Sequence, residues 1–280
     1  MLKLAMLVVL YDKEMVQSKT LTALINYNIE NIYLTIINNG PNSIDEENHI
    51  FEFLKVQTAS IKLYNYLENK PLSKIYNQFI TENFNADGFV FFDDDSLPQA
   101  SYIRSLTSNC HNSDIMIPRI ISTENNNLYY PIEKNNIINT DGYLDAHVTM
   151  SISSGLVIYK EFARKMIEIF GSVFDERFAL YGVDTSFFLR VMRISRANGK
   201  VKIYCAGVIN HSLSRTEGEI SKFRLKERLY DIAITARFYP EYVSFFVFLK
   251  KIVKLLLSAK INLAYLLVYY YIYGKHPRCE

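Results

Sequence analysis

Three consecutive aspartates, Asp93, Asp94 and Asp95, directly follow the apolar run at residues 88–92. A five-residue apolar run is typical of a buried strand, so that strand would end in three carboxylates. Burying carboxylates together is costly unless a cation lies among them. Oxygen ligands at a strand end suit Mg²⁺ or Mn²⁺ with positions open for substrate phosphates. The alternative is an acidic turn exposed to solvent.

Composition limits the class of protein. The 280 residues are 49% hydrophobic, which is enough for a core and too little for a polytopic membrane protein. The cysteines, Cys110, Cys205 and Cys279, have no paired spacing, which favours a reducing cytosol over a disulfide framework. No Cys/His spacing typical of zinc sites is present.

The net charge of +2 is unevenly distributed. Residues 222–280 contain eleven Lys or Arg and four Asp or Glu, a balance of +7 that leaves −5 for the rest. A basic, apolar tail on an acidic body is more typical of a membrane-surface protein than of a nucleic-acid-binding one. We therefore expect a main domain at 1–215 and a helical tail at 216–280 for membrane association or oligomerisation, with no nucleic-acid partner.

Strand-like and helix-like segments alternate through the first hundred residues. Apolar runs predict strands at residues 3–10, 33–37, 61–64 and 89–92. Helical periodicity predicts helices at residues 16–27, 44–56 and 72–83. The alternation indicates an α/β fold, a mostly parallel open sheet flanked by helices. Ligands of such sheets bind beyond the carboxyl ends of the strands, where residues 38–40 and 93–95 fall.

The remaining chain is less regular. An irregular stretch at 113–159 contains strand-like pieces at 115–121 and 151–159. Helices are expected at 161–170 and 187–197, and a strand from 200 leads to His211. Asp184 and Thr185 open the second of these helices. Beyond residue 222 the pattern is helical throughout.

Several motifs occur in an order and at spacings typical of one enzyme family. They are Val8-Val9-Leu10-Tyr11-Asp12, Ile36-Ile37-Asn38-Asn39-Gly40, Leu72-Ser73-Lys74-Ile75-Tyr76-Asn77, Asp93-Asp94-Asp95, Ser153-Ser154-Gly155, Phe174-Asp175-Glu176, Tyr181-Gly182-Val183-Asp184 and Asn210-His211-Ser212. Together they resemble a family-2 glycosyltransferase with the A-type nucleotide-sugar-binding fold. The resemblance extends over about residues 4–215.

The resemblance implies an inverting, metal-dependent glycosyltransferase of the hexosyltransferase type. It implies that Asp93 and Asp95 hold Mn²⁺ or Mg²⁺, with His211 as a further ligand. It also implies that Asp184 is the catalytic base, although Val183 stands where the family has Glu. The alternatives are that Asp184 caps a helix and that His211 is structural.

The resemblance further implies a nucleotide-diphosphate sugar as donor. The donor-binding residues would be Tyr11, Asn38, Asn39, Lys74, Asn77, Asp93 and Asp94. Asn38 and Asn39 stand where the family has acidic residues, and both are also good turn formers. Lys74 and Asn77 lie on a helix face that could be simply solvated. Asp175 and Glu176 are expected to shape a turn or to pair with Arg177.

The tail favours a lipid-linked oligosaccharide acceptor, as in bacterial O-antigen or capsule synthesis, with the enzyme peripheral at the cytoplasmic face of the inner (plasma) membrane. In residues 245–257 the three lysines fall within about a 100° arc of the helix. The uncharged residues 261–273 span about 20 Å of helix, short of the roughly 30 Å hydrocarbon core. The alternative is that these helices pack on the body or form a homodimer.

Two other classes of protein compete with this interpretation. A nucleotidyltransferase has a related fold, but it would carry a glycine-rich phosphate loop that Tyr11-Asp12-Lys13-Glu14 does not provide. A non-catalytic, glycan-binding relative at the membrane would be favoured by loss of Asp184 or of the aspartates, and all of them are present.

Overall fold

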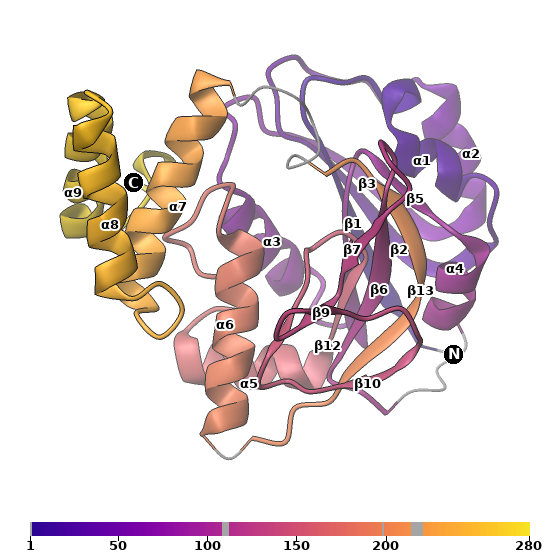
Figure 1. Ribbon diagram of the computed structural model, residues 1–280. Coiled ribbons are helices and arrows are strands. Elements are labelled where there is room, and N and C mark those ends of the chain that lie inside the picture. Colours follow the sequence, from indigo (N-terminus) through magenta and orange to yellow (C-terminus); the bar gives the residue numbers. More distant parts are fainter. Residues whose placement is uncertain (1, 108–111, 198, 214–220) are drawn as a thin grey trace.

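A computed structural model describes residues 2–107, 112–197, 199–213 and 221–280. In the described part, one large sheet lies between two layers of helices, and three further helices extend from one side (Figure 1). Its strands follow the order β10-β13-β6-β12-β4-β1-β2-β3, with β5 on β13 and β7 on β6. The expected α/β class with an open sheet flanked by helices is confirmed.

The strands of the large sheet have the following bounds. They are β1 (Leu4–Leu10), β2 (Ile29–Asn38), β3 (Thr58–Asn65), β4 (Gly88–Asp93), β5 (Ser96–Pro98), β6 (Ile115–Ser122), β7 (Leu128–Tyr130), β10 (Gly142–Leu144), β12 (Leu156–Tyr159) and β13 (Ile203–His211). A small second sheet contains β8 (Ile132–Glu133), β9 (Asn136–Ile137) and β11 (Thr149–Met150).

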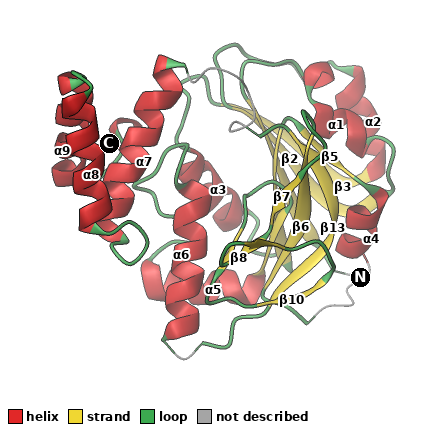
Figure 2. Cartoon of the chain, in the orientation of Figure 1, coloured by secondary structure: helices red, strands yellow, loops and turns green. Residues whose placement is uncertain are grey.

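The helices alternate with these strands in the first half of the chain. The α-helices are α1 (Lys19–Leu24), α2 (His49–Gln57), α3 (Leu72–Glu82), α4 (Ala100–Thr107), α5 (Lys160–Phe170), α6 (Val183–Arg196), α7 (Lys222–Phe238), α8 (Phe245–Leu257) and α9 (Ile261–Tyr273). Short 3₁₀ turns are η1 (Met15–Gln17) and η2 (Pro277–Cys279). Figure 2 shows the strands enclosed between the helices.

Strand pairing aligns the chain segments that matter for function. β1 pairs in parallel with β2 and with β4, so that Leu10 lies opposite Asn38 and Val9 lies opposite Asp93. The carboxyl ends of these strands therefore meet at one edge of the sheet, as predicted for parallel strands. In the other half, β12 lies antiparallel between β4 and β6, and β6 is parallel to β13.

Side chains of the central strand β1 alternate between two hydrophobic cores, as the two-residue period of a strand requires. Leu7 and Val9 pack into a core with α3, α5 and α6. Met6 and Val8 pack into a core with α1, α2 and α4. Because both faces are covered, β1 is apolar at every position and completely buried. The sheet thus provides a rigid platform whose polar groups gather at its ends.

Several local expectations differ from the structure. The helix expected at 16–27 is divided into η1 and α1, because Ser18 caps α1 through a 3.2 Å hydrogen bond from the Leu21 N–H. Strand β12 begins at Leu156 and not at 151, because Leu156 N–H donates to the Ser153 carbonyl and closes a turn. Helix α4 and the short strand β5 were not predicted. The proposed domain boundary at 215/216 and Cys110 lie outside the described residues.

The C-terminal helices form a third layer beyond α6 (Figure 1). Helices α8 and α9 occupy the ranges expected from the sequence, and both pack against α7. In the described parts of the chain, we find no helix that combines the length and the apolar character needed to span a bilayer.

Candidate active site

The three aspartates occupy the turn between β4 and β5, at the carboxyl edge of the sheet. Their side chains are largely shielded from solvent, with 13% of Asp94 and 23% of Asp95 exposed. The start of α1 holds the turn: Thr20 N–H and the Ser18 hydroxyl each donate a 3.1 Å hydrogen bond to the Asp94 carbonyl. The aspartates are therefore not a freely solvated acidic turn.

Asp93, Asp95 and His211 form a cluster that could hold a metal ion, with one ligand atom from each lying within 4.8 Å of the others. β13 places His211 opposite Ser96 of β5, one residue beyond Asp95. His211 Nδ1 lies 3.1 Å from Asp95 Oδ1. Two carboxylates and one imidazole are a donor set that fits Mn²⁺, and Mg²⁺ with water at the remaining positions.

The charges of this cluster are coupled. Burial raises the pKa of Asp93. The positive charge of His211 reduces this shift, and the negative charge of Asp95 reinforces it. For Asp95, burial is outweighed by the hydrogen bond and charge of His211, so its pKa is lowered. The same contact raises the pKa of His211 against the effect of its own burial. The cluster is thus an anionic site that favours a cation.

The turn after β1 closes over the aspartates. Lys13 Nζ lies 2.6 Å from Asp94 Oδ1, and the backbone N–H of Tyr11 also hydrogen-bonds to the Asp94 carboxylate. The Tyr11 side chain is half exposed. A cavity of about 200 Å³ adjoins this turn, lined by residues that include Lys13 and Asn42. Its wall carries both charged and amide groups, and it includes Lys13, the partner of Asp94.

Asp184 lies in the first turn of α6 and faces the same cluster. Gly182, with φ of +85°, is the N-cap of the helix, and no side chain caps it. The alternative role of Asp184 as the cap is therefore not seen. Burial, together with the negative charge of Asp93, raises the pKa of Asp184 to about 6, and hydrogen bonds from Ser153 oppose the shift. A carboxyl group with this pKa can exchange a proton near neutral pH.

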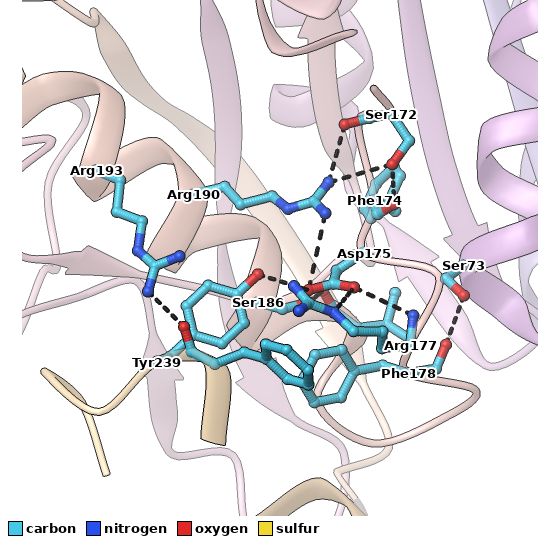
Figure 3. A network of polar contacts seen from close by, with 12 residues as sticks. Ser73, Ser172, Phe174, Asp175, Arg177, Phe178, Ser186, Arg190, Arg193 and Tyr239 are labelled. Atoms are coloured by element: carbon cyan, nitrogen blue, oxygen red, sulfur yellow. Dashed lines mark hydrogen bonds and ion pairs between the residues drawn. The ribbon is translucent and has the colours of Figure 1, made fainter. Parts of the chain in front are cut away.

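A buried ion-pair network positions the loop that leads to Asp184 (Figure 3). Asp175 accepts a 2.7 Å hydrogen bond from Arg177 Nε and another from the Tyr239 hydroxyl, and it lies 3.7 Å from Arg190 Nη2. Arg190 belongs to α6, and Tyr239 directly follows α7. The network therefore joins the loop to both helices. The expected pairing of Asp175 with Arg177 is present.

Sequence reasoning left three residues of this region out of the site. Ser154 Oγ donates a 2.9 Å hydrogen bond to Asp93 Oδ2, and the buried Tyr76 hydroxyl lies 3.3 Å from Ser153 Oγ. Ser153 also contacts Asp184, so this turn connects Asp93 with the candidate base. The Ser-Ser-Gly motif and the motif at residues 72–77, which contains Tyr76, were the available signals.

The amide side chains of Asn38 and Asn39 are buried and hold the loops around them. Asn38 Nδ2 donates to the Asn42 carbonyl and to Asn65 Oδ1, at 2.6 and 2.7 Å. Asn39 exchanges hydrogen bonds of 2.8 and 2.9 Å with the backbone of Lys70. These bonds fit the turn-forming alternative. Donor binding by either residue stays a prediction.

Lys74 and Asn77 have partners away from the aspartates. Lys74 Nζ lies 3.2 Å from the Glu280 backbone oxygen. Asn77 donates to the Phe174 carbonyl and to Glu176 Oε1, and it accepts from the Phe174 N–H. Asn77 therefore supports the loop before Asp184. A donor-binding role for these two residues also stays a prediction.

A larger cavity of about 360 Å³ lies elsewhere, with Asp145, His147 and Lys200 on its wall. Lys200 precedes β13, whose other end carries His211, so this cavity is remote from the cluster of Asp93, Asp95 and His211. The smaller cavity is the one connected to the aspartate turn, through Lys13 and its ion pair with Asp94. We therefore assign the candidate active site to the carboxyl edge of the sheet.

No protein-family model and no curated protein matches this sequence. Solved structures do resemble it. S. aureus TarS 1-349 superposes with a TM-score of 0.57 at 12% identity, covering 97% of this chain and 92% of that one. GalNAc-T7, solved with UDP, GalNAc and Mn²⁺, gives a TM-score of 0.52 at 13% identity, covering 88% of this chain.

The chain has the A-type glycosyltransferase fold. At such low identity the likeness is one of fold alone. TarS 1-349 has also been solved with UDP-GlcNAc, and that structure gives a TM-score of 0.53 at 12% identity, covering 83% of this chain and 66% of that one. This chain spans 44% of the longer TarS structure and 49% of the GalNAc-T7 chain.

Proposed function

We propose that this protein is a glycosyltransferase that uses a nucleoside-diphosphate sugar. One juxtaposition carries the proposal: the Asp93, Asp95 and His211 cluster faces the partly buried Asp184 carboxyl group at the carboxyl edge of the sheet. Structures of the same fold that contain UDP, or UDP-GlcNAc, support this class of donor. The finer assignment is an inverting, metal-dependent enzyme.

In this proposal the donor lies across the carboxyl ends of β1 and β4. Asp93, Asp95 and His211 would hold Mn²⁺ or Mg²⁺, which when bound neutralises charge on the diphosphate leaving group. Lys13, already paired with Asp94, is close enough to the aspartates to contact a phosphate as well. The adjoining cavity of about 200 Å³ would accept the nucleoside.

Asp184 would act as the general base. Its carboxylate takes the proton of an acceptor hydroxyl while that oxygen bonds to the anomeric carbon of the donor sugar. The bond from the anomeric carbon to the phosphate oxygen breaks, and its electron pair leaves with the nucleoside diphosphate. Attack from the face opposite the leaving group inverts the anomeric configuration. A general base of this kind contributes about 10²–10⁴-fold to the rate.

Acceptor and location complete the proposal. The acceptor would be a lipid-linked oligosaccharide, as in O-antigen or capsule synthesis, and the enzyme would work at the cytoplasmic face of a bacterial plasma membrane. The support is the basic, apolar tail, whose charge of +7 contrasts with −5 for the rest of the chain. Anionic lipids attract such a tail.

Donor binding is tested by thermal melting of the full chain with a panel of nucleoside-diphosphate sugars, each with Mn²⁺ and with EDTA. We expect at least one donor to raise the melting temperature, and only in the presence of the metal, because binding stabilises the folded state by mass action. No shift with any donor would contradict the proposal. Synthesis of a nucleotide sugar from a sugar phosphate and a nucleoside triphosphate would instead identify a nucleotidyltransferase.

A further inference from the structure

Helices α8 and α9 expose a broad apolar surface on the side away from α7. The exposed fractions are 75% for Phe246, 84% for Leu257, 66% for Ile261, 70% for Tyr265 and 68% for Ile272. We call this surface the outer face. Monomeric soluble proteins rarely expose contiguous apolar patches of more than a few hundred Å², and larger ones usually mark interaction sites.

The inner sides of the two helices already have partners. Phe248 and Leu255 of α8, and Leu267 of α9, are buried in a cluster with α7. The Phe248 and Tyr271 rings stack at 4.5 Å and join α8 to α9. Packing on the body therefore explains why the helices are apolar on that side. It does not explain the outer face.

The segment after α9 ties this pair of helices to the catalytic body. His276 Nε2 lies 3.1 Å from Glu227 Oε1 of α7, and Arg278 Nη2 lies 3.0 Å from the other carboxylate oxygen. Arg278 also donates a 2.8 Å hydrogen bond to Asn69 Oδ1, in the loop before α3. His276 N–H donates to the Arg177 carbonyl. The outer face is thus held in a defined place on the molecule.

Positive charge borders the outer face, and negative charge is missing from its helices. α8 carries Lys250, Lys251 and Lys254, and Lys260 precedes α9. Residues 245–273 contain no Asp or Glu. With 3.6 residues per turn, Lys250 lies on the same side of α8 as Phe246 and Leu257. Large apolar side chains and free lysines therefore share one surface, which is typical of a helix lying in a lipid interface.

We infer that the outer face of α8 and α9 docks onto an anionic lipid bilayer, with its apolar side chains among the acyl chains and its lysines among the headgroups. A second copy seated on the same face would bring like-charged lysines together without an acidic partner in either helix. Anionic headgroups neutralise those lysines instead. Because α7 joins the outer face to α6 (Figure 2), docking fixes how the catalytic body is oriented relative to the bilayer.

Flotation of the full chain with phosphatidylcholine vesicles, with and without phosphatidylglycerol, tests this inference. We expect binding that depends on phosphatidylglycerol and weakens with salt. Replacing Lys250, Lys251 and Lys254 together by Gln should weaken binding about fivefold per lysine. Phe246→Ser with Leu257→Ser should weaken it by at least about tenfold. All five side chains project from the surface or its edge, and a thermal melt checks that each variant is folded.

Matched variants elsewhere on the surface serve as controls. Phe53→Ser with Val56→Ser removes two exposed apolar side chains from α2. Replacing Lys55, Lys62 and Lys134 together by Gln removes three exposed charges outside the tail. Both controls should bind vesicles like the parent protein.

Three results would overturn the inference. The parent protein could bind vesicles equally well with and without phosphatidylglycerol, or the lysine variant and the Phe246→Ser, Leu257→Ser variant could both bind like the parent. The third result is a parent protein that does not bind vesicles and forms a stable dimer, which Phe246→Ser with Leu257→Ser dissociates. The vesicle assay contains no donor sugar, so it stands apart from the proposed transfer reaction. Asp95→Asn should bind vesicles normally even though it would lose transfer.

Discussion

His211 Nδ1 lies 3.1 Å from Oδ1 of Asp95, although the two residues belong to distant parts of the chain. The pairing of β13 with β5, which sets His211 opposite Ser96, produces this contact. The carboxylate holds the imidazole in place, and Asp93 completes a set of three donors. A metal ion at this set would use ligands that the fold has already brought together.

Asp95→Asn tests the cluster as a metal site. The substitution removes one carboxylate ligand, so we expect Mn²⁺ affinity to fall by at least about tenfold in a calorimetric titration. The variant loses the ion pair with His211 and gains relief of repulsion between the aspartates, so a thermal melt checks that it is folded at the assay temperature. Asp87→Asn, just before the other end of β4, is the matched control and should bind Mn²⁺ normally. If Asp95→Asn bound Mn²⁺ as tightly as the parent protein, the cluster would not be the metal site.

The pH dependence of transfer tests the environment of Asp184. Its pKa is raised to about 6, and a base acts only when deprotonated, so the rate should rise through about pH 6 and level off above it. Ser153→Ala removes a hydrogen bond that lowers this pKa, which should move the midpoint to higher pH. Ser195→Ala, at the remote cavity, should leave the profile unchanged. A midpoint that stays in place in Ser153→Ala would contradict the account.

Asp175→Asn tests the network behind the active-site loop. It leaves the buried Arg190 guanidinium without its charge partner, and breaking such a pair costs about 3–5 kcal/mol of unfolding free energy. Arg177 and the other partners outweigh burial and lower the pKa of Asp175, so its stabilisation is present at neutral pH. The difference between the two proteins in denaturant melts should therefore shrink as the pH falls below about 4. Glu161→Gln, in an exposed pair, should cost less than about 1 kcal/mol.

Alanine substitution at two glycines with the same backbone conformation distinguishes the cost of backbone strain from the cost of steric overlap. Gly171 and Gly182 have φ of +79° and +85°, so alanine at either position costs about 1–2 kcal/mol of strain. A Cβ at Gly171 meets nothing within 4 Å, whereas one at Gly182 would overlap Phe178 and the Asp231 carboxylate. Gly182→Ala should therefore be the less stable variant in denaturant melts by at least about 1 kcal/mol. Equal stabilities would show that the loop before Asp184 adapts freely.

The position of the aspartates at the carboxyl edge of the sheet was predictable from sequence. Gly88–Asp93 changes from apolar to acidic within one residue, and parallel strands place their carboxyl ends at a common edge. The same pattern, with the family resemblance, singled out Asp184 and His211, which the structure brings to that edge. The C-terminal helices were equally clear, because the lysines of residues 245–257 fall on one arc at 3.6 residues per turn and the apolar residues fill the rest.

Side-chain contacts between separate turns and loops were not predictable from the sequence pattern. Ser154 reaches Asp93 only because the four-residue β12 is inserted antiparallel between β4 and β6. Nothing in the periodicity of residues 113–159 specifies that position. Likewise, the pairing of Lys13 with Asp94 depends on how two loops meet, and single polar residues in loops carry no periodic signal.

The most direct test of metal-dependent sugar transfer is an assay of nucleoside diphosphate release. The preferred donor is incubated with an acceptor, with and without Mn²⁺. We predict release that requires the metal and falls by at least about 10²-fold in Asp184→Asn, while that variant still binds the donor. The product should have the opposite anomeric configuration from the donor. Turnover that continues in excess EDTA, or a rate in Asp184→Asn equal to that of the parent protein, would contradict the account.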